Sequence, residues 1–422
     1  MNLRSDLFFF HSIHLLCGFF LLHGQETELV EKSNESSQVL FATEGIVVEE
    51  VPSEISQFFG RLGEATRRDK AIEGSDFFSG EEFVKEMERN QAAEGRKLDL
   101  FGIAQGLIVK GLASSIKLMA YDEFHIARLE SLGEKRFLVY VRHYDNLYNA
   151  SFLVRWWLLE DDERGFLCYD FEDLDSGIRT SAMTLVGYQA ILAQGRELDE
   201  WLDPLMLIVQ ILQTKGLEDP EAWEAMGKPI LELYESEKLP MSFRGFISLM
   251  KVNLHIFEWE IEEGLATLAK MKEDKISSLA WNYLRANLLM MDESYKEAID
   301  ELESYAKFMG WDSDSLGLLA DCYYFEGNIP KAREVALRGL ADNPRASLCA
   351  ATWALCSSVK ELRAEAAELF AQGAWKEQFY EDSLDYLIDM EEMDKAKVLF
   401  QIFREEVQES ELFEYYQEIF KD

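Results

Sequence analysis

Few side chains in this sequence are suited to proton or metal chemistry. Outside the first 24 residues the histidines are His125, His143 and His255. The first two fall on neighbouring predicted strands, where a two-residue turn places them on opposite faces and a three-residue turn brings them together. Together they could bind a metal ion, and apart they are ordinary half-buried histidines. We expect the two histidines to lie apart, as ordinary half-buried side chains, and predict no metal site.

Carboxylates crowd the end of another predicted strand. Asp170, Glu172, Asp173 and Asp175 lie within six residues, and paired carboxylates can carry out acid and base catalysis. No nucleophile or metal motif stands near them in the sequence. We therefore interpret the group as a solvated turn that pairs with Arg179.

Sequence motifs give no further support for catalysis. Asp312-x-Asp314-x-x-Gly317 imitates the start of a calcium loop, but Leu316 occupies a ligand position and Tyr323 stands where the bidentate glutamate belongs. The chain contains no G-x-S-x-G, no H-E-x-x-H and no G-x-x-x-x-G-K-[ST]. The sequence thus predicts a protein that is not an enzyme and needs no cofactor.

Composition limits the possible partners. The chain has 422 residues, with 42 Lys and Arg against 79 Asp and Glu, and a formal net charge of −37. Such a surface repels nucleic-acid phosphates and anionic lipid headgroups. A hydrophobic content of 48% predicts a folded chain, and only 7 prolines indicate a helix-rich one.

The N-terminus has the pattern of an export signal. An apolar run from Leu7 to Leu22 follows Arg4 and is shorter than the roughly 20 residues that span a bilayer. Gly24 offers a small residue for cleavage, which predicts a signal peptide over residues 1–24 and a periplasmic or extracellular protein beginning at Gln25. The alternative is an uncleaved membrane anchor formed by residues 7–22.

Four further regions follow the signal. Residues 25–52 are acidic and polar and predict a flexible tether. Residues 53–180 predict an α+β domain with helices over 54–70, 79–89 and 98–119, then strands over 124–132, 135–144, 150–160 and 165–171. Ser79 and Glu82 form a capping box at the second helix. Residues 181–240 predict a helical connector, and residues 241–422 an α-solenoid.

The α+β domain should place its helices on one face of an antiparallel meander sheet at about residues 124–171. This element order resembles the cystatin and nuclear-transport-factor-like folds. The resemblance implies a pocket between helix and sheet that Trp156 or Trp157 could line. Adjacent strand residues point to opposite faces, so one of the two should face the core.

The C-terminal half repeats with a period of 34 residues. A small residue recurs at Gly264, Ala298, Ala332 and Ala366, which predicts close contact between paired helices. An apolar residue stands three positions earlier in the first three units. Ala396 follows after only 30 residues, so the last unit should be shortened or act as a cap.

One unit carries the full pattern, and it resembles a tetratricopeptide repeat (TPR). In this unit small residues allow two helices to touch, Tyr323 fills the space between them, Gly327 serves the turn and Pro344 ends the second helix. The residues that predict repeat packing are Gly264, Ala298, Ala320, Tyr323, Gly327, Ala332, Ala336, Pro344 and Ala366.

The resemblance implies a groove, lined by the first helix of each pair, that holds a peptide or protein segment. The groove residues implied by the repeat phase are Asn253, Tyr283, Asn287, Met290, Asp321 and Tyr324. The TPR subtype that clamps acidic C-terminal tails needs lysine or arginine, but the matching positions are Leu249, Leu284, Leu318 and Thr352. We therefore expect a neutral or basic partner.

These observations predict an exported, non-catalytic scaffold that binds a protein or peptide partner. The alternative is a small-ligand carrier or an enzyme that uses a pocket in the α+β domain. The repeat phase also separates the cysteines of the mature chain, because equivalent positions on packed helices lie too far apart for a disulfide. We predict free thiols at Cys168, Cys322, Cys349 and Cys356, with the three helical ones buried.

Overall fold

The computed structural model describes residues 46–67, 72–93, 105–118, 120–145, 150–174, 178–185, 200–215, 220–274, 280–343, 346–371, 377–404 and 411–420. The chain divides into two compact units between Trp281 and Asn282. The predicted signal peptide, residues 25–45 of the predicted tether, and Pro344 lie outside the described residues. None of the described helices is long and apolar enough to span a bilayer.

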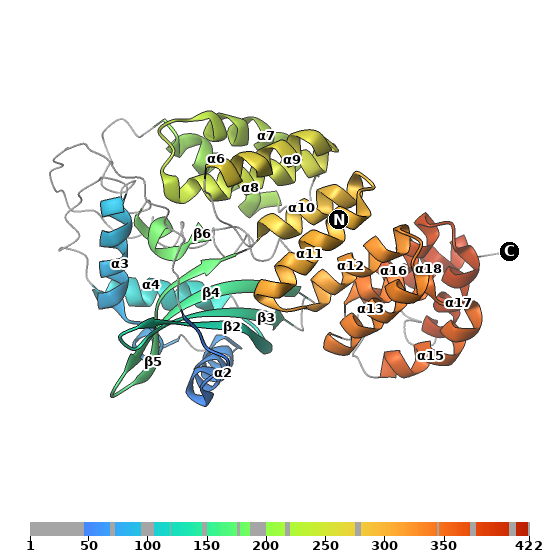
Figure 1. Ribbon diagram of the computed structural model, residues 1–422, viewed down its shortest axis with the longest axis horizontal. Helices are drawn as coiled ribbons and strands as arrows, with labels where there is room; N and C mark the ends of the chain where they lie inside the picture. The colour runs from blue at the N-terminus through green and yellow to red at the C-terminus, as the bar shows by residue number, and fades with distance from the viewer. Residues whose placement is uncertain are drawn as a thin grey trace. The chain divides into compact units, whose positions relative to one another are not determined.

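The first unit combines an antiparallel sheet with helices (Figure 1). Its elements are β1 (Ile46–Val47), α2 (Ser53–Arg67), η1 (Gly74–Asp76), α3 (Gly80–Ala93), α4 (Gln105–Leu118), β2 (Glu123–Gly133), β3 (Arg136–Asp145), β4 (Ala150–Asp161), β5 (Gly165–Asp173), β6 (Ile178–Arg179), α6 (Leu202–Lys215), α7 (Pro220–Glu235), α8 (Met241–Glu258) and α9 (Ile261–Glu273).

Helices alone make up the described part of the second unit, and α10 (Ala280–Met291) spans the division. The remaining helices are α11 (Tyr295–Met309), α12 (Ser313–Phe325), α13 (Ile329–Asp342), α14 (Ser347–Cys356), α15 (Val359–Ala371), α16 (Glu377–Asp389), α17 (Met393–Phe403) and α18 (Glu411–Ile419). The predicted fold class, an α+β region followed by an array of helix pairs, is confirmed.

In the described part of the chain the sheet has six antiparallel strands in the order β1-β2-β3-β4-β5-β6. The four predicted strands end within two residues of β2 to β5. Glu134 and Lys135 form the two-residue loop between β2 and β3, with φ of 48° and 61°. Positive φ at both positions matches the twist of a tight hairpin.

The two edge strands were not predicted. Ile46 and Val47 lie in the segment interpreted as a tether, yet they pair with Ser131 and Glu130 of β2. Each edge strand has only two residues, which is too short to produce an alternating pattern. The predicted tether over residues 25–52 is therefore corrected, because residues 46 and 47 at its end form a strand of the sheet.

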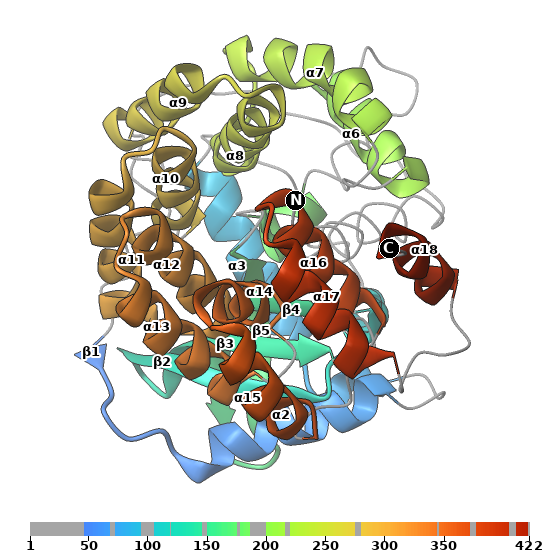
Figure 2. The same cartoon turned by 90° about the vertical axis from the view of Figure 1, so that its right-hand side faces the viewer.

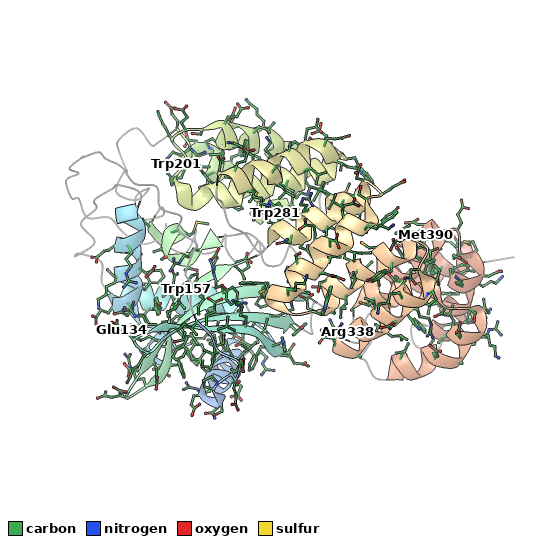
Figure 3. All side chains as sticks on the ribbon, viewed as in Figure 1. Glu134, Trp157, Trp201, Trp281, Arg338 and Met390 are labelled. Carbon is green, nitrogen blue, oxygen red and sulfur yellow. The ribbon has the colours of Figure 1, made fainter. Side chains whose placement is uncertain are left out.

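Helices α2, α3 and α4 pack their apolar side chains against one face of the sheet. Phe58 and Phe59 of α2 contact a core that includes Val139, Val154 and Trp156. Trp157 lies on the opposite face, outside this core. The prediction that the adjacent tryptophans face opposite sides is confirmed, and Figure 3 labels Trp157 on the sheet.

Helix α3 begins as the capping pattern predicts. The backbone N–H of Glu82 donates to Ser79 Oγ over 3.4 Å, which satisfies one free N–H of the first turn. The backbone N–H of Ser79 donates instead to the Cys168 carbonyl of β5. The Glu82 carboxylate is thereby left to pair with Arg136 and Lys85.

A second apolar core joins the helices of the first unit. Trp201, Leu205, Trp223 and Phe243 pack together between α6, α7 and α8; Figure 3 labels Trp201 among these helices. The predicted start of the solenoid, residue 241, falls inside this unit, because α8 shares its core with α6 and α7.

The second unit stacks antiparallel helix pairs (Figure 2). Its repeating small residues, Ala298, Ala332 and Ala366, are all buried, each on the second helix of its pair, and so is the equivalent Gly264 on α9 of the first unit. Gly327 sits at a turn with φ of 86°, a conformation that favours glycine.

Gly339, Ala320 and Ala336 are also buried, whereas Tyr323 is not. A Cβ at Gly339 would lie 2.3 Å from Cys349 Sγ, so α13 and α14 approach closely at this glycine. Tyr323 is half-buried near the end of α12. That it fills the space between the helices stays a prediction.

Candidate functional site

The two strand histidines do not form a joint site. Phe124 pairs with His143 and His125 with Arg142, so the two imidazoles point to opposite faces. His125 is exposed, while His143 is fully buried and accepts a hydrogen bond from Trp156 Nε1 over 3.1 Å. Burial, helped by Arg142, lowers the pKa of His143 to about 3. His143 is therefore a neutral part of the core.

Asp170, Glu172 and Asp173 of β5 are buried, which corrects their interpretation as a solvated turn, and Asp175 lies outside the described residues. Asp170 is 1% exposed and Glu172 is 3% exposed. Arg179 donates to Asp170 over 2.5 Å and to Glu86 of α3 over 2.7 Å, and Arg155 pairs with Glu172. Burial raises the pKa of Asp170 although Arg179 opposes it.

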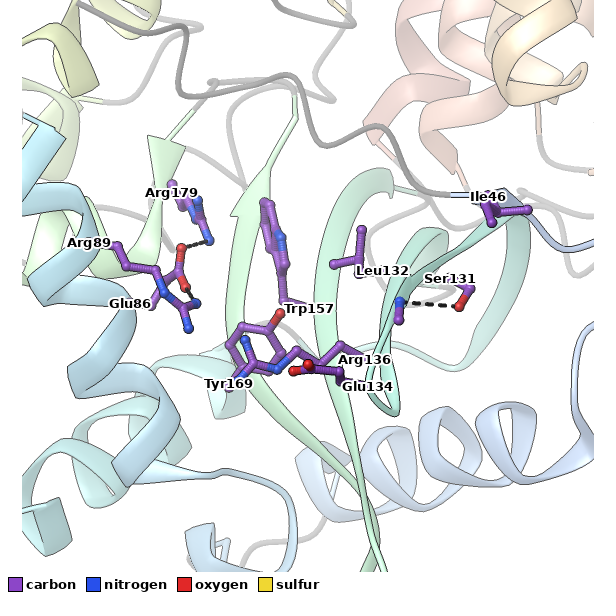
Figure 4. A pocket seen from close by; sticks show the side chains of 11 residues that line it. Ile46, Glu86, Arg89, Ser131, Leu132, Glu134, Arg136, Trp157, Tyr169 and Arg179 are labelled. Carbon is purple, nitrogen blue, oxygen red and sulfur yellow. Dashed lines mark hydrogen bonds and ion pairs between the residues drawn. The ribbon is translucent and has the colours of Figure 1, made fainter. Parts of the chain in front are cut away.

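These ion pairs enclose an aromatic side chain on the outer sheet face. The guanidinium carbon of Arg179 lies 4.0 Å from the ring centre of Trp157, and that of Arg155 lies 4.8 Å away. A cavity of about 630 Å³ opens beside Trp157 (Figure 4). The resemblance implied a pocket between helix and sheet, but Trp156 on that side is packed in the core, and the cavity lies beside Trp157 on the outer face. Glu86, Arg136 and Tyr169 were missed because three separate elements bring them together.

Among the described residues, three groups at the α8–α9 turn lie close enough to suggest metal ligands. His255, Glu258 and Glu260 place one ligand atom each within 4.8 Å of one another. Both glutamates are exposed, and His255 Nδ1 lies 2.8 Å from Glu260 Oε2. This hydrogen bond stabilises the α8–α9 turn and explains why the three groups lie close together.

The residues of the implied groove fall into two groups. Tyr283, Asn287 and Met290 are all half-buried on α10. Their spacing of four and three residues places them on one face of the helix. Tyr324 is half-buried at the end of α12, with its ring centre 5.3 Å from that of Phe325. These four side chains reach the surface of the second unit.

The other two implied groove residues differ in exposure, because Asn253 is half-buried and Asp321 is buried. The side chain of Asn253, in the first unit, donates to the Leu249 carbonyl of its own helix over 3.0 Å. Asp321 is 3% exposed. The Thr352 hydroxyl of α14 contacts the Asp321 carboxyl, and the buried Tyr386 hydroxyl of α16 lies beside them.

The positions that would carry an acid-binding clamp also face inward. Leu249, Leu284, Leu318 and Thr352 are all buried. Helices α12 and α14 are buried along most of their lengths, as expected for helices that are apolar on all sides. The absence of lysine or arginine at these four positions thus reflects packing.

A partly exposed aromatic edge, formed by Tyr295, Phe325 and Ile329, was not predicted as a site. The rings of Tyr295 and Phe325 stack at 5.6 Å, and Phe325 and Ile329 are 39% and 36% exposed. Tyr295 and Ile329 are the apolar residues that stand three positions before the repeating alanines. Their period was visible in the sequence, but their exposure was not.

Asp312, the first residue of the calcium-like motif, caps a helix. Its Oδ1 accepts from the backbone N–H groups of Asp314 and Ser315, and Tyr305 donates to its other oxygen over 3.2 Å. The carboxylate is therefore occupied by the start of α12, as the departures from a calcium loop suggest.

Comparison with known proteins adds little to what the structure shows. No family model matches the chain, and no curated protein matches its sequence. Among solved structures, one similar chain is YrrB, described as a TPR protein with an unusual peptide-binding site. The alignment has a TM-score of 0.28 and 18% identity, and covers 47% of this chain and 100% of YrrB. A likeness at this level assigns neither an activity nor a site.

Proposed function

We propose that this protein is a non-catalytic scaffold that binds a protein or peptide partner through its array of helix pairs. The observation that carries the proposal is the stripe of Tyr283, Asn287 and Met290 on one accessible face of α10. An aromatic ring, an amide and a thioether in one row combine adaptable apolar contact with hydrogen bonding, which suits a peptide backbone and its side chains.

The expected partner is neutral or basic. The net charge of −37 favours a complementary positive partner and repels acidic segments. Electrostatic attraction of this kind mainly raises the association rate, so binding should weaken as salt is added.

Photocrosslinking from defined positions tests the proposed surface. A benzophenone amino acid replaces Tyr283 in one variant and Asn287 in another, both expressed in the native host. The matched control carries the same amino acid at Lys228, whose side chain is 84% exposed on α7. We expect a discrete crosslinked protein from the two α10 positions and none from Lys228. Equal products from all three positions, or none from α10, would refute the proposed surface.

We further propose that the protein is exported and that residues 1–24 are removed. The apolar segment from Leu7 to Leu22 and the small Gly24 support this proposal. Mass spectrometry of the protein from its host should find Gln25 at the N-terminus. A protein that keeps Met1 and sediments with membranes would support the anchor formed by residues 7–22.

A further inference from the structure

The cavity on the outer sheet face has the features of a ligand site. It is lined by α3, by all six strands of the sheet and by the turn between β2 and β3 (Figure 4). Its volume of about 630 Å³ falls within the range of small-molecule sites in proteins. This site lies in the first unit and is independent of the surface on α10.

Two buried aromatic side chains present polar atoms that have no partner in the protein. Trp157 and Tyr169 both line the cavity and are 3% and 2% exposed. Within the described part of the chain, neither the indole N–H nor the phenol hydroxyl makes a hydrogen bond. Neither atom is among the fully buried, unpartnered polar atoms of the described residues, so both are reached from the cavity. A ligand that accepts hydrogen bonds can therefore pair with both.

Arg136 supplies a positive charge and has N–H groups beyond the one that donates to Glu82. One of its Nη atoms donates to Glu82 over 2.7 Å, and its guanidinium carbon lies 5.6 Å from the ring centre of Tyr169. A guanidinium has five N–H donors in a planar fork, so Arg136 can hold a second acceptor. Arg179, in contrast, is held between Asp170 and Glu86 and fixes the position of Trp157.

The charges at the cavity nearly cancel. It is lined by Arg89, Arg136 and Arg179 and by Glu86 and Glu134, a formal sum of 3 − 2 = +1. Arg136 also pairs with Glu82 and Arg179 with Asp170, which brings the sum to 3 − 4 = −1, so hydrogen bonds rather than net charge must hold an anion here. A dianion such as a phosphate monoester would meet repulsion from both lining glutamates.

The remaining lining supplies an apolar surface. Leu132 and Ile46 stand at the end of the cavity away from Arg89 and Arg179 (Figure 4). We propose that the cavity binds a small carboxylic acid with an apolar or aromatic body. The carboxylate accepts from the Tyr169 hydroxyl, the Trp157 indole and the Arg136 guanidinium, and the body covers Leu132 and the aromatic rings.

Calorimetry with the full mature chain tests this inference, using octanoate and 4-phenylbutanoate as probes. The matched neutral probes are octanamide and 4-phenylbutanamide. At least one of the acids should bind, and its amide should bind about tenfold more weakly or not at all, because a charged acceptor makes the stronger hydrogen bonds. No binding of either acid, or equal binding of acid and amide, overturns the proposal.

Tyr169→Phe locates the site with little risk to the fold, since the lost hydroxyl has no partner in the protein. We expect this variant to bind the acid about tenfold more weakly, with an unchanged melting temperature. Arg164→Gln is the control, because Arg164 is exposed on the turn before β5 and does not line the cavity. An unchanged affinity in Tyr169→Phe places the acid elsewhere and refutes the assignment.

Discussion

Asp321 is a buried carboxyl group whose pKa is raised by burial. Thr352 has one hydroxyl proton, yet its oxygen contacts both the Asp321 carboxyl and, at 2.9 Å, the Leu348 carbonyl. Thr352 can therefore donate to only one of these two oxygens at a time. Burial raises the pKa of Asp321 from 3.8 to about 7, although the Thr352 hydroxyl opposes the shift.

The raised pKa predicts a pH-dependent stability. The folded state keeps the Asp321 proton above pH 4, where the unfolded state releases it, so the free energy of unfolding falls as pH rises to about 7. Asp321→Asn should remove this fall and should be more stable than wild type at pH 8, by up to about 4 kcal/mol. Urea unfolding of both proteins at pH 5 and pH 8 measures the difference.

Asp300→Asn, at an exposed position of α11, is the matched control and should follow wild type at both pH values. A stability difference between Asp321→Asn and wild type that is equal at pH 5 and pH 8 would mean that Asp321 is ionised in the fold at both.

For single residues, the sequence predicted identity and position but not burial. The cluster around Asp170 was visible as a run of acidic residues, and Arg179 was named as its partner. Its burial was not predictable, because Glu86 comes from a helix 84 residues away in the chain. Asp321 was placed correctly on a first helix, but the Thr352 contact that turns it inward depends on how α14 packs.

At the scale of elements, the strands were predictable from their composition and the helix pairs from their 34-residue period. β2 to β5 are rich in β-branched and aromatic residues and are bounded by turn residues such as Gly133 and Gly165. β1 and β6 gave no such signal. The polar groups of the cavity come from several of these elements, so their convergence became visible only in the fold.

Ala332 tests how closely the paired helices pack. It is fully buried in α13, so the extra bulk of Ala332→Leu should lower the free energy of unfolding by about 1–3 kcal/mol. Ala341→Leu makes the same change at an exposed position of that helix and should have little effect. Urea unfolding followed by circular dichroism compares them, and equal midpoints would contradict close contact at Ala332.

For the whole molecule, the net charge of −37 predicts a response to salt. Self-repulsion destabilises a compact, highly charged chain, and added salt screens it within about 10 Å at 0.1 M. The melting temperature should therefore rise between 10 mM and about 300 mM sodium chloride at pH 7.5. A melting temperature that falls over this range would show that attractive surface ion pairs outweigh the repulsion.

The cysteines of the described residues are free, and they are spread over both units. Cys168, Cys322 and Cys349 are buried, whereas Cys356 is partly exposed, contrary to the expectation for the helical thiols. Burial also raises the pKa of Cys322 to about 12, which keeps it in the unreactive thiol form.

Alkylation of the denatured, non-reduced chain should therefore add four labels to the mature protein. Mass spectrometry counts them, and a chain that keeps residues 1–24 should carry a fifth label at Cys17. Two labels that appear only after reduction would reveal a disulfide and contradict the arrangement of the helices.

Strand β1 has a consequence for where the molecule can act. Because Ile46 is paired to β2, the sheet begins 24 residues after Leu22, the end of the apolar segment. Twenty-four fully extended residues reach at most about 86 Å. If that segment stays in a bilayer, every partner and ligand of the sheet unit must be met within that radius of the membrane surface, whereas cleavage at Gly24 frees the whole molecule to diffuse.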